Sequence, residues 1–273
     1  MKVSMIGGVF FKSDDPKKMQ DWYAKHLGVP YMSSYGGTFV WNQRDNPDEI
    51  GHTAWSAMGS DTNYYDPSEA SFMINYRVSD LEILLKELES NGVKTVGKME
   101  SFDYGKFGWA LDAENNKIEF WEPVDSVYAG MLETVNEVKR VTGIGGVFFK
   151  AKDPKGLQTW YGKQLGIPNL SQYGGIFEWR SKPQTDAYAH TVWGVFDSKT
   201  DYFNPGKNDM IINYRVENLE DLMATLKSEG VEQVGKIDRY DYGNFGWILD
   251  PDGNKIELWE PNDEVFRKVN GLG

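Results

Sequence analysis

Two pairs of ionisable residues recur at matching positions in this 273-residue sequence and could carry chemistry. Glu119 and Glu257 stand in similar apolar segments, 138 positions apart (257 − 119), and a pair of histidines has the same spacing, His52 with His190. A carboxylate in apolar surroundings has a raised pKa and can accept and return a proton. A His and a Glu could instead hold a divalent metal, although two ligands are one fewer than a usual catalytic zinc site has. The sequence therefore offers proton transfer by either Glu, or metal binding by a Glu with the His of its own half.

Recurring polar residues form a second candidate set. They are Asn75 and Arg77 in the first half and Asn213 and Arg215 in the second. The alternation of a strand puts Asn75 and Arg77 on one face, where they would line a cavity and donate hydrogen bonds to an anionic or carbonyl ligand. The alternative interpretation is structural: Arg77 would form an ion pair with Asp103 or Glu119 and hold neighbouring segments together.

Aromatic residues are numerous, with 10 Trp, 15 Tyr and 14 Phe, and large rings recur in both halves. Some rings on strands belong to the core, and we expect others to wall a cavity and stack on a flat or apolar ligand. The candidates for this role are Trp41, Trp55, Tyr104 and Trp109, with their counterparts Trp179, Trp193, Tyr242 and Trp247.

These pairs arise because the sequence contains itself twice. Residues 6–123 return as residues 144–261 without insertion or deletion. A repeat this long indicates duplicated domains, each of about 120 residues and large enough for its own core. We therefore expect a first domain over 1–123, a linker over 124–142 that is helical from the spacing of its apolar residues, and a second domain with a C-terminal tail over 143–273.

Within each copy the pattern predicts two similar halves, each starting with a strand and a helix. Asp15-Pro16 is typical of a helix start and Gly28 of a helix end, and a stripe of leucines from Leu81 to Leu88 predicts a second helix. The strands predicted for the first copy are 3–12, 38–41, 52–58, 72–78, 93–98, 107–111 and 117–121. Each copy thus reads as strand-helix-strands followed by strand-helix-strands.

Composition excludes several classes of partner and site. The formal net charge of −12 repels phosphate backbones and anionic membranes, so we expect neither a nucleic acid nor a membrane as partner. The absence of Cys excludes thiolate zinc sites, iron–sulfur clusters and Cys nucleophiles. No apolar run approaches the roughly 18 residues of a membrane span, and the start has no apolar signal-peptide core. We expect a soluble, cytoplasmic protein.

Several motifs resemble the vicinal oxygen chelate superfamily, which includes glyoxalase I, bleomycin-resistance proteins, fosfomycin-resistance enzymes and extradiol dioxygenases. The motifs are Asp15-Pro16, Trp22-Tyr23 and Leu27-Gly28 at the start, the segment 107–119 at the end of the first copy, and the segment 250–258 in the second. The resemblance implies an α+β fold of four βαβββ modules, which form two concave mixed sheets around two cavities. Its implied ligand class is a small molecule.

The resemblance also implies a divalent metal, but this sequence departs from the usual ligand pattern. The family's first ligand lies seven residues before the helix-capping Asp, at a position that holds Gly8 here and Gly146 in the second copy. The matching positions in the following modules hold Met73 and Ile211, which are not ligands, whereas Glu119 and Glu257 are kept. No cofactor is therefore favoured, and a metal held by His52 with Glu119, or by His190 with Glu257, stays open.

Two functions follow as hypotheses. The first is a metal-independent binder of small aromatic or amphipathic molecules, similar to bleomycin-resistance proteins. The alternative is a glyoxalase-like lyase or isomerase, or a dioxygenase, with Glu119 or Glu257 as general base or metal ligand. Duplication supplies within one chain what single-domain relatives obtain by dimerising, so a monomer is compatible with the sequence, and a homodimer stays open.

Overall fold

A computed structural model describes residues 3–32, 36–132, 140–171, 174–181 and 187–272. The first copy contains β1 (Met5–Ser13), α1 (Pro16–Leu27), β2 (Tyr31–Met32), β3 (Gly36–Asn42), β4 (Ile50–Gly59), β5 (Phe72–Arg77), α2 (Leu81–Ser90), β6 (Thr95–Phe102), β7 (Gly105–Leu111) and β8 (Lys117–Pro123). The second contains β9 (Gly143–Ala151), α4 (Pro154–Leu165), β10 (Gly175–Arg180), β11 (Tyr188–Asp197), β12 (Met210–Arg215), α5 (Leu219–Ser228), β13 (Gln233–Tyr240), β14 (Gly243–Leu249), β15 (Lys255–Pro261) and α6 (Asp263–Val269). Every strand and helix that the repeat predicts is present.

Local signals in the sequence fix the ends of the first helix. The Asp15 side chain accepts a hydrogen bond from the backbone N–H of Lys18, and Pro16 occupies the first helical position, where its missing N–H costs nothing. Gly28 ends α1 in the left-handed conformation, with φ of 65°, which a side chain would disfavour. Asp153, Pro154 and Gly166 repeat this arrangement around α4.

The sheet consists of two halves with the same topology. Strand order is β3-β4-β1-β5-β8-β7-β6 in the first half, with β2 on β3, and β10-β11-β9-β12-β15-β14-β13 in the second. In each module the first strand pairs with the last strand in parallel, as β1 does with β4 and β5 with β8. Among the described residues, the edge strands β3 and β10 of the two halves pair at Asn42 and Arg180. Four βαβββ modules thus build two mixed half-sheets, which confirms the predicted α+β fold.

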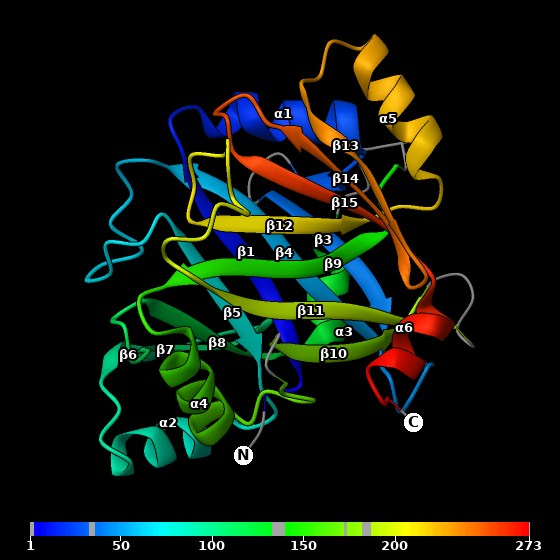
Figure 1. Ribbon diagram of the computed structural model, residues 1–273. Helices are drawn as coiled ribbons and strands as arrows, with labels where there is room; N and C mark the ends of the chain where they lie inside the picture. The colour runs from blue at the N-terminus through cyan, green and yellow to red at the C-terminus, as the bar shows by residue number, and fades with distance from the viewer. Residues whose placement is uncertain (1–2, 33–35, 133–139, 172–173, 182–186, 273) are drawn as a thin grey trace.

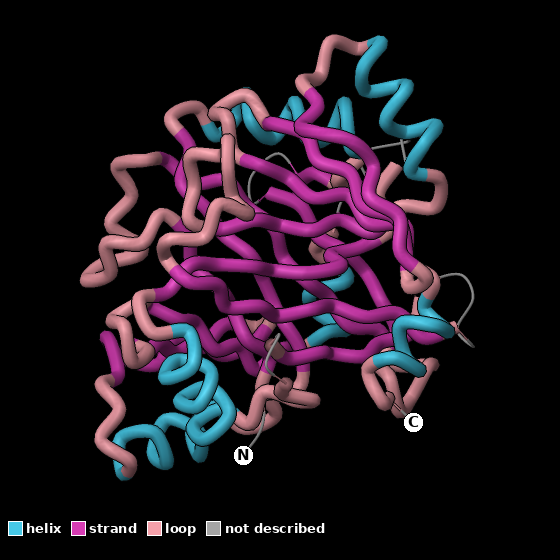
Figure 2. Tube along the Cα trace, in the orientation of Figure 1, coloured by secondary structure: helices cyan, strands magenta, loops and turns pink. Residues whose placement is uncertain are grey.

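The two half-sheets lie against each other with their strands crossing, as the ribbon and tube views show (Figures 1 and 2). On β1, Val9 and Phe11 point into one hydrophobic core that both copies share, whereas Phe10 points to the opposite, concave face and packs in a separate cluster. Helices α1, α2, α4 and α5 each pack on strands of their own copy, and their C-terminal ends meet across the copies: His26 of α1 bonds to Glu229 at the end of α5, and Gln164 of α4 bonds to Asn91 at the end of α2.

Reciprocal hydrogen bonds connect the two copies within the shared core. Trp55 Nε1 donates to the Tyr214 hydroxyl at 2.6 Å, and the symmetry-related pair of Trp193 and Tyr76 forms the same bond at 2.8 Å. The hydroxyls of Tyr23 and Tyr161 likewise donate to a carboxylate of the other copy, Asp250 at 3.2 Å and Asp112 at 3.0 Å. A surface of each copy is therefore complementary to the same surface of the other, as in a two-fold dimer.

The linker contributes to the first copy. The predicted helical stretch 124–142 contains α3 (Asp125–Gly130), and residues 133–139 lie outside the described residues. The C-terminal tail contains the matching helix α6, in which Asp263 and Phe266 correspond to Asp125 and Tyr128 of α3. The repeat therefore extends further than the segment 6–123. Within the described residues, no helix is both long and apolar enough to span a bilayer.

Replacement of Tyr214 by Phe tests the shared core. The change leaves the buried Trp55 N–H without an acceptor, so we expect the free energy of unfolding to fall by about 1–3 kcal/mol. Urea unfolding followed by tryptophan fluorescence measures this loss. Tyr240→Phe is the matched control, because that ring is 52% exposed and its variant should unfold as the wild type does. Equal stability of the Tyr214→Phe variant would contradict the assigned role of the bond.

Candidate functional site

A row of adjacent side chains crosses the concave face of each half-sheet. In the second copy the residues paired from strand to strand are Trp247, Glu257, Asn213, Gly146 and Val192. In the first copy they are Trp109, Glu119, Asn75, Gly8 and Ala54. The register therefore brings the predicted Glu and Asn residues into contact and places Gly146 or Gly8, where the resemblance would put a metal ligand, beside them.

Each Glu in this row is buried and surrounded by donors. Glu257 is 1% exposed. Its Oε1 accepts a hydrogen bond from Asn213 Nδ2 at 2.6 Å, and its Oε2 accepts bonds from Trp247 Nε1 at 2.8 Å and from the Tyr202 hydroxyl. Burial raises the pKa of Glu257, against the opposing effect of these three donors and of Lys255. The result is a fixed carboxylate that holds a proton more readily than a carboxylate in water.

Glu119 repeats this arrangement in the first copy. It accepts hydrogen bonds from Asn75 Nδ2 at 2.7 Å, from Trp109 Nε1 at 2.7 Å and from the Tyr64 hydroxyl. Its pKa is likewise raised by burial. The two tyrosines are recurring rings whose role as carboxylate donors the sequence did not reveal, since each lies in a loop 55 residues before its Glu.

A lysine lies beside each of these buried carboxylates. Lys255 Nζ donates to the backbone carbonyl of Tyr202 at 2.6 Å and lies 4.9 and 5.2 Å from the ring centres of Tyr202 and Trp247. Burial lowers the pKa of this ammonium group, which the nearby Glu257 opposes. The lysine therefore supports the two donor rings and partly balances the charge of the Glu.

Above Glu257 lies a cavity of about 570 Å³. Its walls are mainly aromatic, and it is lined by Phe148, Ser171, Gly174, Ile176, Val192, Phe196, Tyr202, Asp238, Tyr240, Tyr242, Phe245, Trp247, Glu257, Phe266, Val269 and Asn270. Strands β9 to β11 and β13 to β15 supply the floor and sides, and α6 supplies one wall. The cavity thus combines a deep apolar surface with a single buried carboxylate.

Two adjacent glycines make this floor possible. A side chain on Gly145 would collide with Asn213 Oδ1 and would come within 2.9 Å of Arg215 Cγ and 3.0 Å of Trp259 Cε3. A side chain on Gly146 would meet Phe148 Cζ at 2.7 Å, because the Phe148 ring folds over this glycine. Gly145 therefore leaves room for the Asn that holds Glu257, and Gly146 leaves room for a phenyl ring.

The predicted His and Arg residues lie together, apart from the carboxylate. His190 Nδ1 is 2.8 Å from Asp263 Oδ1, and Arg215 forms an ion pair with both oxygens of Asp263. Burial would raise the Asp263 pKa, but the bonds from His190 and Arg215 outweigh this effect, and the pKa is lowered. The first copy repeats the cluster with His52, Arg77 and Asp125.

This cluster corrects two expectations. Arg77 is 4% exposed and forms its ion pair with Asp125 rather than with Asp103 or Glu119, so its guanidinium anchors α3, and the residue also lines a separate cavity of about 390 Å³ beside Trp41. Arg215 anchors α6 in the same way. The structural interpretation of both arginines was the better one, but the sequence misassigned the partner because Asp125 lies in the segment taken as a linker.

The residues present do not fit the metal that the resemblance implies. The space at Gly8 and Gly146 is filled by the rings of Phe10 and Phe148. The Nδ1 atom of His190 is bonded to Asp263, and its Nε2 atom lies 3.6 Å from Glu178 Oε1. Two arginines also contact Glu178, and their positive charges would repel a metal cation. Among the described residues, no three His, Cys, Asp or Glu side chains converge to hold a metal.

The aromatic candidates divide between the cavity and the core. Trp247 and Tyr242 line the second cavity, and Trp109 and Tyr104 occupy the corresponding positions of the first concave face. The other four, Trp41, Trp55, Trp179 and Trp193, belong to the core between the copies and do not wall the concave cavity. The alternation of β4 and β11 turns Trp55 and Trp193 inward, since Ala54 and Val192 face the cavity.

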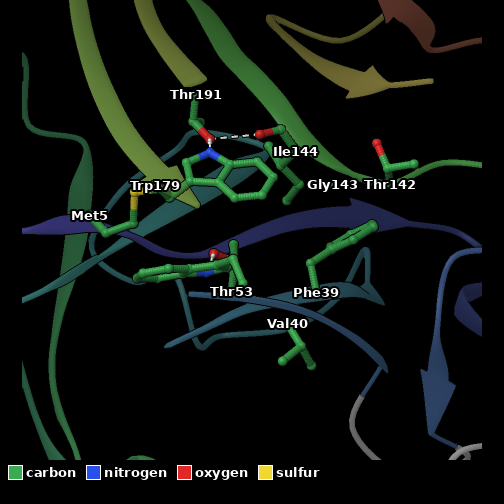
Figure 3. Close-up of a pocket in the computed structure, with 10 residues that line it drawn as sticks. Met5, Phe39, Val40, Thr53, Thr142, Gly143, Ile144, Trp179 and Thr191 are labelled. Carbon is green, nitrogen blue, oxygen red and sulfur yellow. Dashed lines mark hydrogen bonds between the residues drawn. The ribbon is translucent and has the colours of Figure 1, made fainter. Parts of the chain in front are cut away.

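A minute cavity lies where the two copies meet, and residues of both copies, including Trp41 and Trp179, line it. Figure 3 shows Trp179 and Thr191 of the second copy on one side, and Thr53 and Phe39 of the first on the other. Its volume of about 10 Å³ has room for one water molecule at most. Each tryptophan donates to a threonine of its own copy at 3.0 Å, so the polar groups here are already paired.

Comparisons with known proteins agree with this architecture. No protein-family model and no curated sequence matches the chain. Among solved structures it is similar to a catechol 2,3-dioxygenase, with a TM-score of 0.61 and 15% identity over 96% of this chain and 90% of that one. A Mn(II)-bound glyoxalase from Novosphingobium aromaticivorans has a TM-score of 0.61 and 13% identity over 95% and 82%. The 2,2',3-trihydroxybiphenyl 1,2-dioxygenase of Sphingomonas wittichii strain RW1 has a TM-score of 0.55 and 16% identity over 95% and 91%.

These likenesses establish the fold. The chain shares the fold of these dioxygenases and of this glyoxalase, which is the arrangement of βαβββ modules that the resemblance implied. At these identities the chemistry has to be argued from the side chains of this chain.

Alanine at either glycine tests how the floor is built. Gly145→Ala meets three fixed side chains, so we expect a loss of about 1–3 kcal/mol in the free energy of unfolding. Gly146→Ala meets the far end of the Phe148 side chain, which can move aside by rotation about its Cα–Cβ bond, and the Val192 backbone oxygen at 3.1 Å, so its loss should be smaller. Urea unfolding compares them, with Gly130→Ala as control because that position is open. Equal effects of Gly145→Ala and Gly130→Ala would contradict the assigned role of Gly145.

Proposed function

We propose that this protein binds small aromatic or amphipathic molecules in the concave cavity of its second copy, without the metal of the family's enzymes. The observation that carries the proposal is the cavity of about 570 Å³ with aromatic walls and one buried carboxylate at its floor. Small-molecule sites have volumes of roughly 300–1,000 Å³ and combine apolar walls with a few fixed polar groups. The cavity above Glu257 meets this description.

Ring geometry supports a flat ligand. The rings of Tyr240 and Tyr242 are stacked with centres 5.2 Å apart and planes within 8°, and those of Phe196 and Tyr202 are stacked at 5.2 Å within 10°. Such parallel faces bury large apolar area and favour offset stacking with a further aromatic ring. The Tyr202 ring cannot turn freely, because its hydroxyl is bonded to Glu257.

The carboxylate supports recognition of one hydrogen-bond donor. An ionised carboxylate has about four acceptor positions, of which the three protein donors around Glu257 occupy three. The fourth is available to a ligand hydroxyl or N–H. The preferred ligand is therefore a flat, mostly apolar molecule with one donor group.

Isothermal titration calorimetry with 2-naphthol tests this proposal. We expect a dissociation constant in the micromolar range or tighter, unchanged by EDTA, because no step of binding uses a metal. Val192→Trp fills the cavity and should weaken binding at that site at least tenfold. Val40→Trp is the matched control, since Val40 is an exposed strand residue outside the cavity. A requirement for added metal, or equal binding by both variants, would contradict the proposal.

Proton transfer is a second candidate function, favoured by the raised pKa of Glu257 and by its position in the cavity. A carboxylate in this setting can remove a proton from a carbon next to a carbonyl group and return it to the neighbouring carbon. This isomerisation consumes no co-reactant. Glu119 has the equivalent donors, and burial raises its pKa as well, so both copies would contribute.

Paired substitutions test this second function. Glu119→Gln with Glu257→Gln removes both bases, so isomerisation of the hemithioacetal of methylglyoxal and glutathione should be lost, and each single variant should keep roughly half the rate. The fold should tolerate Gln, because Asn213 Oδ1 is buried without a hydrogen-bond partner and its amide can turn to accept from the new N–H. Full activity in the double variant would reject the function, and retained 2-naphthol binding would show that its site is intact.

A further inference from the structure

The two concave faces have the same floor but differ in one wall. That wall lies on β3 in the first copy and β10 in the second, where Thr38 pairs with Ala54 and Ile176 pairs with Val192. Ile176 and Val192 both line the second cavity. Because the repeat has no insertion, Thr38 and Ala54 occupy the same positions on the first concave face.

The short helix after each copy completes this wall. Tyr128 of α3 packs on the rings of Trp121 and Tyr104, with centres 5.0 and 6.4 Å away. Phe266 of α6 packs on the corresponding rings of the second copy, with centres 5.1 and 6.5 Å away. The two rings are thus placed alike, and they differ by one hydroxyl group.

That hydroxyl forms a polar pair which the second copy lacks. The Tyr128 hydroxyl lies 3.0 Å from Thr38 Oγ1, and Phe266 with Ile176 puts only carbon at these positions. Two hydroxyls that share one hydrogen bond use one of their two hydrogens, so the other hydrogen is left for a further acceptor. Burial raises the pKa of Tyr128, so its hydroxyl keeps its proton at neutral pH.

At two neighbouring positions the first copy also has a smaller or non-aromatic side chain where the second copy has a larger one. Phe196 of the second copy stacks on Tyr202, and its counterpart is Met58, which has no ring to stack and packs with the first concave cluster. Ala54 replaces Val192 and is smaller. The first face therefore carries smaller side chains at Thr38 and Ala54 and one additional polar pair, and the second face is more aromatic.

We infer that the two concave faces select different ligands, an inference that rests on the proposed binding function. Both floors accept one donor group through their Glu. The first face prefers molecules that also carry a hydrogen-bond acceptor, such as a ketone or an amide, which receives a bond from the Thr38–Tyr128 pair. The second face prefers molecules with a hydrocarbon group at that end.

Calorimetry with two matched probes tests the selectivity. The probes are 6-acetyl-2-naphthol and 6-ethyl-2-naphthol, which share the donor and differ in the acceptor. Each face is measured alone, the first in a Val192→Trp protein and the second in an Ala54→Trp protein. We expect the first face to bind the acetyl probe at least fivefold more tightly than the ethyl probe, and the second face to show the reverse order.

Exchange of the wall residues shows which groups are responsible. Thr38→Ile with Tyr128→Phe, in the Val192→Trp background, should abolish the preference of the first face for the acetyl probe. The reciprocal change, Ile176→Thr with Phe266→Tyr in the Ala54→Trp background, should create that preference in the second face and provides a test if the first double variant fails to fold.

The outcomes separate this inference from the proposed function. Equal probe ratios at the two faces, or ratios that the exchanges leave unchanged, would overturn the inference while binding itself stands. If neither probe binds to the wild-type protein or to any variant, the binding function is rejected and the inference with it.

Discussion

A carboxylate with almost no exposed surface must receive most of its hydrogen bonds from the protein, because few water molecules can reach it. This requirement governs the concave face of each copy. Glu257 receives donors from three different elements: β12 supplies Asn213, β14 supplies Trp247, and a loop supplies Tyr202. Asn213 fits only because Gly145 has no side chain. The need to solvate the buried carboxylate therefore also explains why a glycine occupies this position.

Most of the fold could be predicted from the sequence. The repeat gave the number of modules, and the residues around α1 gave its limits, because the cap and the terminating glycine are local signals. The packing of one copy on the other could not be predicted, since Trp55 and Tyr214 are far apart in sequence and nothing local to either marks it as a partner. Strand alternation was also insufficient for Trp55, because it shows which residues share a face but not which face is concave.

The candidate site was predicted in part. Glu257 and Asn213 were found because they recur and lie on strands, and the register then places them side by side. Arg215, expected to face a ligand, forms an ion pair with Asp263, which lies beyond the end of the detected repeat. Comparison of α3 with α6, which share an acidic residue and an aromatic ring at the same spacing, is the signal that could have revealed this partner.

The placement of the cavities has a consequence for how such a chain can change over time. The faces that bind the two copies together are buried in one shared core, whereas Thr38 and Ile176 belong to walls on the opposite side of each half-sheet. A substitution in one wall therefore leaves the reciprocal bonds of the core intact and does not touch the other cavity. Duplication inside one chain frees the two copies from the identity that a homodimer imposes, so each cavity can acquire its own specificity by single substitutions while the common scaffold is conserved.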